Sequence, residues 1–172
     1  MQSTIPDLSW NKTEKLLKSP PDIDHIVLFY VPLHMGCRQF INLFSTLSQQ
    51  FAQDGKEVKF VKVDCSGAIL GNNLCHRYNV SHVPTVAYVS QFEFQREKLP
   101  PHGPIQRSLR WSISSMMEDI NAVHATCYKG DLFVYQELLD WATLMYNISR
   151  FKRWFDRVFV GWLSRLGQLL SP

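Results

Sequence analysis

The pattern of apolar and polar positions divides the chain into segments of strand length and segments of helix length. Residues 26–31 form a continuous apolar run, which is typical of a strand buried on both faces of a central sheet. Further strands are predicted at residues 58–63, 85–89 and 92–96. Apolar residues at helical spacing from Phe40 to Phe51 predict a helix between the first two strands.

The remaining segments are helical and complete the order of elements. An N-capping pattern at residues 11–14 predicts a short helix before a double proline, and residues 74–78 predict another. After a loop rich in Pro and Gly, two long helices are predicted over residues 105–126 and 131–168. The order strand, helix, strand, helix, strand, strand, helix predicts an α/β fold in which a right-handed parallel unit joins a hairpin.

The C-terminal segment shows a pronounced amphipathic pattern. From residue 151 onward, large apolar residues recur every three to four positions, and basic residues such as Arg153 and Arg157 take the opposite face. The aromatic members of the apolar stripe are Phe151, Trp154, Phe155, Phe159 and Trp162. We expect a basic amphipathic helix whose aromatic stripe and arginines contact a partner protein or a membrane surface.

Composition narrows the classes of protein. The chain has 172 residues, of which 45% are hydrophobic and 19% charged, so it can bury a substantial core. No segment approaches the roughly 18 consecutive apolar residues of a membrane span, and the first residues lack the basic and apolar stretches of an ordinary signal peptide. Residues 150–172 carry five Lys or Arg against one acidic residue, whereas the rest is nearly neutral. A neutral body argues against a nucleic-acid partner.

Three short motifs resemble one family. Residues 29–37, Phe-Tyr-Val-Pro-Leu-His-Met-Gly-Cys, resemble the segment Phe-Tyr-Ala-Pro-Trp-Cys-Gly-His-Cys of thioredoxins and protein disulfide isomerases. Residues 83–85, Val-Pro-Thr, resemble the family's cis-proline loop, which faces that segment. Val-Asp-Cys at residues 63–65, followed by Cys75, resembles the isomerase and quiescin sulfhydryl oxidase version. The resemblance implies a thioredoxin-like fold, a central mixed sheet flanked by helices, over about residues 8–120.

Departures from the family motif indicate a degenerate active site. His34 stands where the family has its nucleophilic cysteine, and imidazole cannot form the mixed disulfide of thiol exchange. Cys37 matches the second cysteine, which is shielded in the family. Leu28 replaces a buried acid, and Leu33 replaces the tryptophan. We therefore do not expect a dithiol oxidoreductase, and we treat His34, Cys37 and Pro84 as a vestigial site.

Two alternatives remain open for these residues. Cys37 is either an inert core residue or a single active thiol assisted by His34, three positions earlier at a helix start. A metal held by the two would need two more ligands, and no residues nearby have ligand spacing, so neither a metal nor another cofactor is expected. The loop of Pro84 is either retained for the fold or used to bind a client peptide.

The resemblance also implies a structural disulfide between Cys65 and Cys75. Such a bridge requires an oxidising compartment, for which the ER lumen and the mitochondrial intermembrane space are the alternatives. Together with the basic aromatic helix, it favours an organellar setting, and a mitochondrial membrane is preferred. Cys127 is left over and is expected to be inert.

The sequence thus predicts a thioredoxin-like domain at residues 1–125 and a helical extension at residues 126–172. The function expected is that of a non-catalytic structural subunit, docked through the extension in a larger protein assembly. The stripe could instead pack on the protein's own body, or it could contact a membrane surface as well as a protein partner. The alternative functions are a single-thiol isomerase acting through Cys37 and a client-binding module acting through Pro84.

Overall fold

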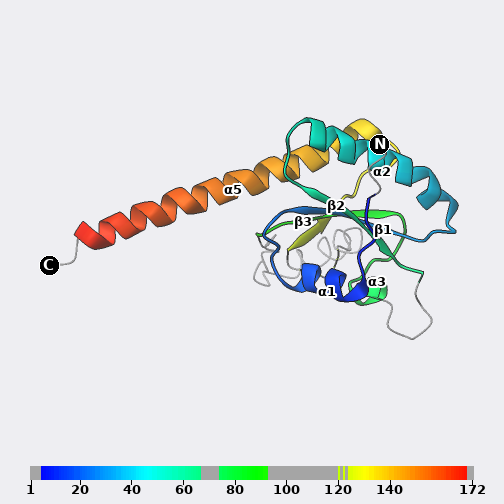
Figure 1. Ribbon diagram of the computed structural model, residues 1–172, viewed down its shortest axis with the longest axis horizontal. Coiled ribbons are helices and arrows are strands. Elements are labelled where there is room, and N and C mark those ends of the chain that lie inside the picture. The colour runs from blue at the N-terminus through cyan, green and yellow to red at the C-terminus, as the bar shows by residue number, and fades with distance from the viewer. Residues whose placement is uncertain (1–4, 67–73, 93–119, 121, 123, 170–172) are drawn as a thin grey trace, which may run out of the picture.

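The computed structural model describes residues 5–66, 74–92, 120, 122 and 124–169 (Figure 1). Four strands and four helices follow one another along this part of the chain. In order they are α1 (Trp10–Lys18), β1 (His25–Tyr30), α2 (Met35–Gln53), β2 (Lys59–Asp64), α3 (Leu74–Arg77), β3 (Thr85–Val89), β4 (Ala125–Cys127) and α5 (Tyr135–Leu169).

The sheet is mixed, with the strand order β2-β1-β3-β4. β1 pairs in parallel with β2, and Ile26 lies opposite Phe60. β1 also pairs antiparallel with β3, and β3 pairs antiparallel with β4. The apolar run of β1 is explained by this central place, because all its residues after His25 are buried.

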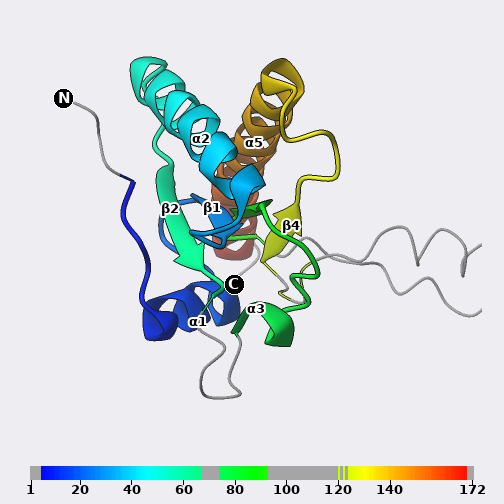
Figure 2. The same cartoon turned by 90° about the vertical axis from the view of Figure 1, so that its right-hand side faces the viewer.

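Helices cover both faces of the sheet (Figure 2): α1 and α3 lie on one face, and α2 and the first half of α5 on the other. Alternate residues of β1 serve the two layers. Ile26 and Leu28 belong to the core under α2 and α5, whereas Val27 and Phe29 belong to the core under α1. The expected architecture of a central mixed sheet flanked by helices is confirmed.

The aromatic face of α2 forms the centre of the larger core. Phe40, Phe44 and Phe51 recur at helical spacing and are buried, as the sequence pattern predicted. The ring of Phe60 on β2 lies 5.4 Å from both the Phe44 and Phe51 ring centroids. This packing fixes α2 on the sheet and thereby places its N-terminus beside the end of β1.

The last strand is not where the sequence predicted it. Of the strand expected at residues 92–96, Phe92 lies in a bend and the rest falls outside the described residues. The strand that pairs with β3 is β4, at residues 125–127. The predicted helix at 105–126 lies mostly outside the described residues, but its predicted end is wrong because residues 125–127 are extended. A strand of three residues is too short to show a period of its own.

The predicted helix at 131–168 is confirmed as α5, and it has two parts. Its first half closes the core over α2 with four buried residues, Leu138, Ala142, Met145 and Tyr146. The predicted division at residue 125 falls inside β4, so the packed body continues into α5. The second half leaves the body and points away from it (Figure 1). Within the described residues, no helix has a stretch long and apolar enough to span a bilayer.

Candidate functional site

The predicted vestigial site lies in the turn that connects the end of β1 to the start of α2. After Tyr30 the chain turns, and the backbone N–H of His34 donates to the Val31 carbonyl at 3.1 Å. His34 is the N-terminal capping residue of α2, but its side chain makes no capping hydrogen bond. Its imidazole is exposed, as are the neighbouring side chains of Leu33 and Met35. The residue that the motif resemblance aligns with the family nucleophile is therefore exposed, and it is a histidine.

Cys37, in the first turn of α2, is fully buried and belongs to the core. Its Sγ accepts a long hydrogen bond of 3.5 Å from the Val31 backbone N–H. Leu28, which the motif resemblance aligned with a buried acid, is fully buried in the same core cluster. Among the described residues there is no hydrogen bond between His34 and Cys37. A thiol that attacks a disulfide must reach its target sulfur, and the burial of Cys37 prevents this.

His34, Gly36 and Pro84 lie close together at the start of α2. The peptide bond from Val83 to Pro84 is cis, as the motif predicted. A Cβ on Gly36 would stand 3.2 Å from the imidazole Cε1 of His34 and 3.8 Å from Cδ of Pro84. The absence of a side chain at Gly36 therefore lets the imidazole and the proline loop approach the helix start.

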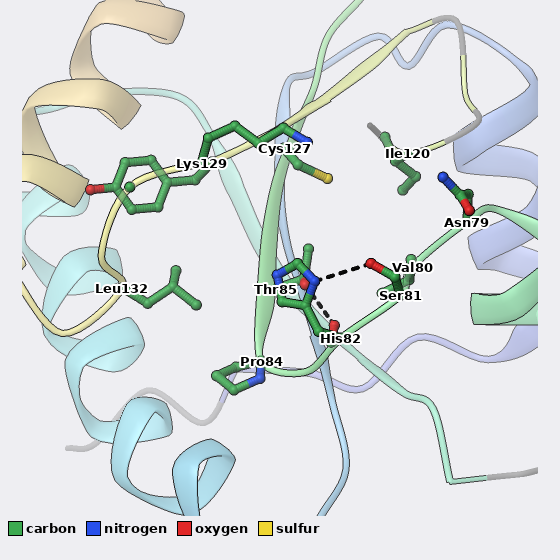
Figure 3. Close-up of a pocket in the computed structure, with 12 residues that line it drawn as sticks. Asn79, Val80, Ser81, His82, Pro84, Thr85, Ile120, Cys127, Lys129 and Leu132 are labelled. Carbon is green, nitrogen blue, oxygen red and sulfur yellow. Dashed lines mark hydrogen bonds between the residues drawn. The ribbon is translucent and has the colours of Figure 1, made fainter. Parts of the chain in front are cut away.

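A cavity of about 330 Å³ lies beside the proline loop (Figure 3). The loop before β3 forms one side, and the segment after β4 forms the other. Its lining residues include Ser81, His82, Pro84, Cys127, Tyr128 and Leu132. Of these residues, sequence reasoning assigned a functional role only to Pro84 and expected Cys127 to be inert, because the segment around β4 comes from more than 40 residues further along the chain.

Hydrogen bonds fix the shape of this cavity. Thr85 Oγ1 donates to the carbonyl of His82 at 2.7 Å, and Ser81 Oγ lies 3.1 Å from the ring Nδ1 of His82. On the other side, burial and the nearby Glu137 carboxylate raise the pKa of the Tyr128 hydroxyl. The cavity thus offers hydroxyl, imidazole and backbone groups together with the Lys129 side chain around a proline, which suits contact with a peptide.

The predicted disulfide is present. Cys65, directly after β2, is bonded to Cys75 in α3, with Cα atoms 5.8 Å apart. The backbone N–H of Cys65 donates to the Tyr30 carbonyl at 2.8 Å. The bridge therefore ties α3 to the sheet edge next to the end of β1.

Arg153, which the sequence placed on the partner-binding face, pairs with Asp24 and anchors α5 to the body. Its Nη2 donates to the carboxylate of Asp24 at 2.9 Å, and the Tyr88 hydroxyl donates to the same carboxylate at 2.8 Å. Asp24 is fully buried, and a buried carboxylate requires such partners. Burial and this neighbouring charge raise the pKa of Tyr88 above its ordinary range. Asp24 and Tyr88 were not singled out from the sequence.

The aromatic stripe of α5 is exposed. Its five aromatic members are between 45% and 62% exposed: Phe151, Trp154, Phe155, Phe159 and Trp162. The rings of Phe155 and Phe159 stack at 5.7 Å, so the stripe is a continuous aromatic surface. Every residue from 154 to 160 is exposed, including Arg157, so the helix is open to solvent on every side in this part.

Comparison with known proteins begins with a family model. Residues 7–99, more than half of the chain, match the model described as Thioredoxin. A comparison with curated protein sequences finds no significant match. In the part of the chain that the structure describes, no group of three or more potential ligands could hold a metal ion.

Among solved structures, a fragment of ERdj5 has a similar fold. The J-Trx1 fragment of ERdj5 matches with a TM-score of 0.54 and 16% identity, covering 86% of this chain and 52% of the fragment. Human ERp44 matches with a TM-score of 0.45 and 19% identity, covering 69% of this chain and 31% of ERp44. The mitochondrial thioredoxin 3 of Saccharomyces cerevisiae matches with a TM-score of 0.41 and 19% identity, covering 52% of this chain and 76% of that thioredoxin. The chain thus spans about half of the ERdj5 fragment, and the predicted thioredoxin-like fold is confirmed.

Proposed function

Because the chain belongs to the thioredoxin family, we propose that it is a member of the isomerase and quiescin oxidase type whose active site has degenerated. Its role in this proposal is that of a non-catalytic subunit, docked in a larger protein assembly. The body is a rigid platform, and the distal half of α5, residues 154–169, is the docking element.

Thiol exchange is disfavoured by the geometry at the start of α2. The surface position carries His34, which cannot form a disulfide, and the remaining thiol of Cys37 is buried in the core. The alternative of a single active thiol needs an exposed Cys37 assisted by His34. Burial of the thiol and the missing hydrogen bond both count against that alternative.

The exposed aromatic stripe of α5 is the observation that carries the proposal. Contiguous apolar surfaces of this kind in soluble proteins mark sites of interaction, because exposure of large rings to water is unfavourable. Most of the stability of a helix in a protein comes from tertiary packing of its apolar face, and in residues 154–160 that face is exposed. A partner that covers the stripe would bury the rings and stabilise the helix at the same time.

The docking element also bears on location. The disulfide between Cys65 and Cys75 favours an oxidising compartment. Lys152 and Arg157 beside the aromatic rings suit peripheral contact with a membrane. We propose an organellar setting, with a mitochondrial membrane-associated assembly preferred over the ER lumen.

The test is the native size of the protein in gently solubilised cells. A truncation at Ser149 would remove Arg153 and leave Asp24 buried without its cation, so point variants are sharper. The double variant Phe155→Asp/Phe159→Asp should shift the protein from a large particle to a monomer of about 20 kDa. The control, Leu33→Asp/Met35→Asp, changes two apolar residues at the start of α2 that are even more exposed, and it should leave the particle intact.

A second candidate function is client binding at the proline loop, which the cavity beside Pro84 favours. It predicts that the variant Leu33→Asp/Met35→Asp, together with Pro84→Ala, weakens association with a client, while the α5 variant does not. If only the α5 variant changes the native size, docking is the function and the client-binding candidate is rejected.

A further inference from the structure

A second cavity lies at the point where the second half of α5 leaves the body. Its volume is about 480 Å³. One wall is formed by α5 and the other by the turn between α2 and β2. The lining residues are Gly55, Glu57, Tyr146, Arg150, Arg153, Trp154 and Arg157.

Three guanidinium groups face this cavity from one side of α5, because residues 150, 153 and 157 are spaced by three and four positions. Arg153 already forms an ion pair with Asp24. Arg150 donates only to the hydroxyl of Tyr146, at 3.3 Å, and lies over its ring. In the part of the chain that the structure describes, no carboxylate lies within ion-pair distance of Arg150 or Arg157. Two guanidinium groups, each with five donors in a planar fork, are thus available to an anion.

The opposite wall leaves room for a ligand. Gly55 has a positive φ of 65°, which ends α2 in a tight turn, and a Cβ added there would meet nothing within 4 Å. Glu57 is exposed on this wall and forms no ion pair with the described arginines. A simple anion would be repelled by Glu57. An anion that also carries a hydroxyl or ammonium donor would satisfy both walls, because the carboxylate accepts hydrogen bonds.

Trp154 connects the cavity with the aromatic stripe. It lies four positions after Arg150 and three before Arg157, so it stands between them on the helix surface. Its ring centroid is 5.9 Å from that of Phe151, which belongs to the stripe. The two arginines in the cavity are therefore directly next to an exposed aromatic surface. A ligand that fits both has an anionic head and an apolar tail.

We propose that this cavity binds the phosphate head group of an anionic phospholipid. Arg150 and Arg157 hold the phosphate oxygens, Glu57 accepts from the hydroxyl or ammonium of the head group, and Trp154 packs against the start of the acyl chains. Phosphate is the group whose oxygens match paired guanidinium forks. The lipid site goes beyond the proposed docking function. The cavity would bind a phospholipid regardless of which protein contacts the distal half of α5.

The test uses flotation of the full-length protein with vesicles of phosphatidylcholine, with and without phosphatidylserine. Arg150→Gln/Arg157→Gln should reduce partition onto the anionic vesicles about tenfold or more, without changing the melting temperature, because both side chains are exposed. The control Lys12→Gln/Lys15→Gln removes the same charge from exposed positions of α1, on the opposite face of the sheet (Figure 2). It should reduce partition less than about twofold.

Equal losses for the two double variants would show a general charge effect and overturn the proposal. The absence of wild-type binding to anionic vesicles would also overturn it. Inorganic phosphate and glycerol 3-phosphate are added as soluble probes at constant ionic strength. If either stabilises the protein through Arg150 and Arg157 as strongly as the vesicles do, the lipid assignment is overturned in favour of a soluble phosphate ester. Native particle size reports separately on docking, so the failure of either proposal is recognisable.

Discussion

Arg153 and Asp24 are 129 residues apart in the chain, yet they form a partly buried ion pair with 2.9 Å between Nη2 and Oδ2. Asp24 directly precedes β1, and Arg153 is the last residue of α5 before the helix becomes exposed on every side. The pair therefore fixes the point at which the long helix leaves the body. It also sets the direction in which the aromatic stripe is presented.

Loss of Arg153 should destabilise the whole body. Arg153→Met leaves the Asp24 carboxylate buried with only the Tyr88 hydroxyl as a partner, and we expect the free energy of unfolding to fall by about 3 kcal/mol. Asp24→Asn in the same chain should recover part of this loss, because the uncompensated charge is removed. Chemical denaturation of the two single variants and the double variant measures the coupling. A change below about 0.5 kcal/mol for Arg153→Met would contradict the anchoring role.

The first half of α5 should behave as part of the core. Leu138→Ala removes a fully buried side chain from the cluster that contains Phe40 and Phe44, and we expect a loss of about 2–4 kcal/mol. Leu144→Ala is the control on the same helix, because that side chain is 56% exposed and should cost less than about 0.5 kcal/mol. Equal effects of the two substitutions would mean that α5 is an independent extension.

The sequence could predict those features that have a local signal. The apolar run of β1 and the helical spacing from Phe40 to Phe51 each bury a face, so the pattern predicts both the elements and the core. The motifs around Cys37 and Pro84 predicted the fold through their resemblance to a known family, and the Val-Asp-Cys motif followed by Cys75 predicted the disulfide in the same way.

The features that the sequence did not predict depend on contacts between distant segments. β4 has three residues and exists through its pairing with β3. Arg153 carries the same charge as its neighbour Arg157, and only the position of Asp24 in the fold decides which of them is a tether. The walls of both cavities likewise come from segments far apart in the chain, so no spacing along the sequence marks them.

Cys37 should resist alkylation in the native protein. Its thiol is fully buried, whereas Cys127 is half-buried at the cavity beside Pro84. We therefore expect iodoacetamide at neutral pH to label Cys127 faster than Cys37, and both at similar rates in denaturant. Mass spectrometry of peptides from timed samples measures the two rates. Rapid labelling of Cys37 in the native protein would instead support the alternative function, a single-thiol isomerase that acts through Cys37.

The disulfide should contribute to stability through the loop that it closes. Cys65 and Cys75 are separated by 10 positions, for which loop closure gives about 2–3 kcal/mol. Cys65→Ala/Cys75→Ala should therefore lower the free energy of unfolding by that amount and abolish its dependence on reductant. If reductant destabilises the double variant as much as the wild type, the bridge is not the source of the effect.

His25, the first residue of β1, should make the stability depend on pH. Burial lowers the pKa of its imidazole below the ordinary value of 6.5, although a ring N–H donates to the Ile23 carbonyl at 2.7 Å. Because the native pKa is lower than the unfolded one, the unfolded chain binds more protons as pH falls through this range. Stability from this group is therefore complete above about pH 7.5 and is lost as pH falls through 6.5 toward the native pKa. His25→Gln should flatten the decline between about pH 7.5 and 5, measured by urea denaturation at each pH. An unchanged slope in His25→Gln would show that another group causes the decline.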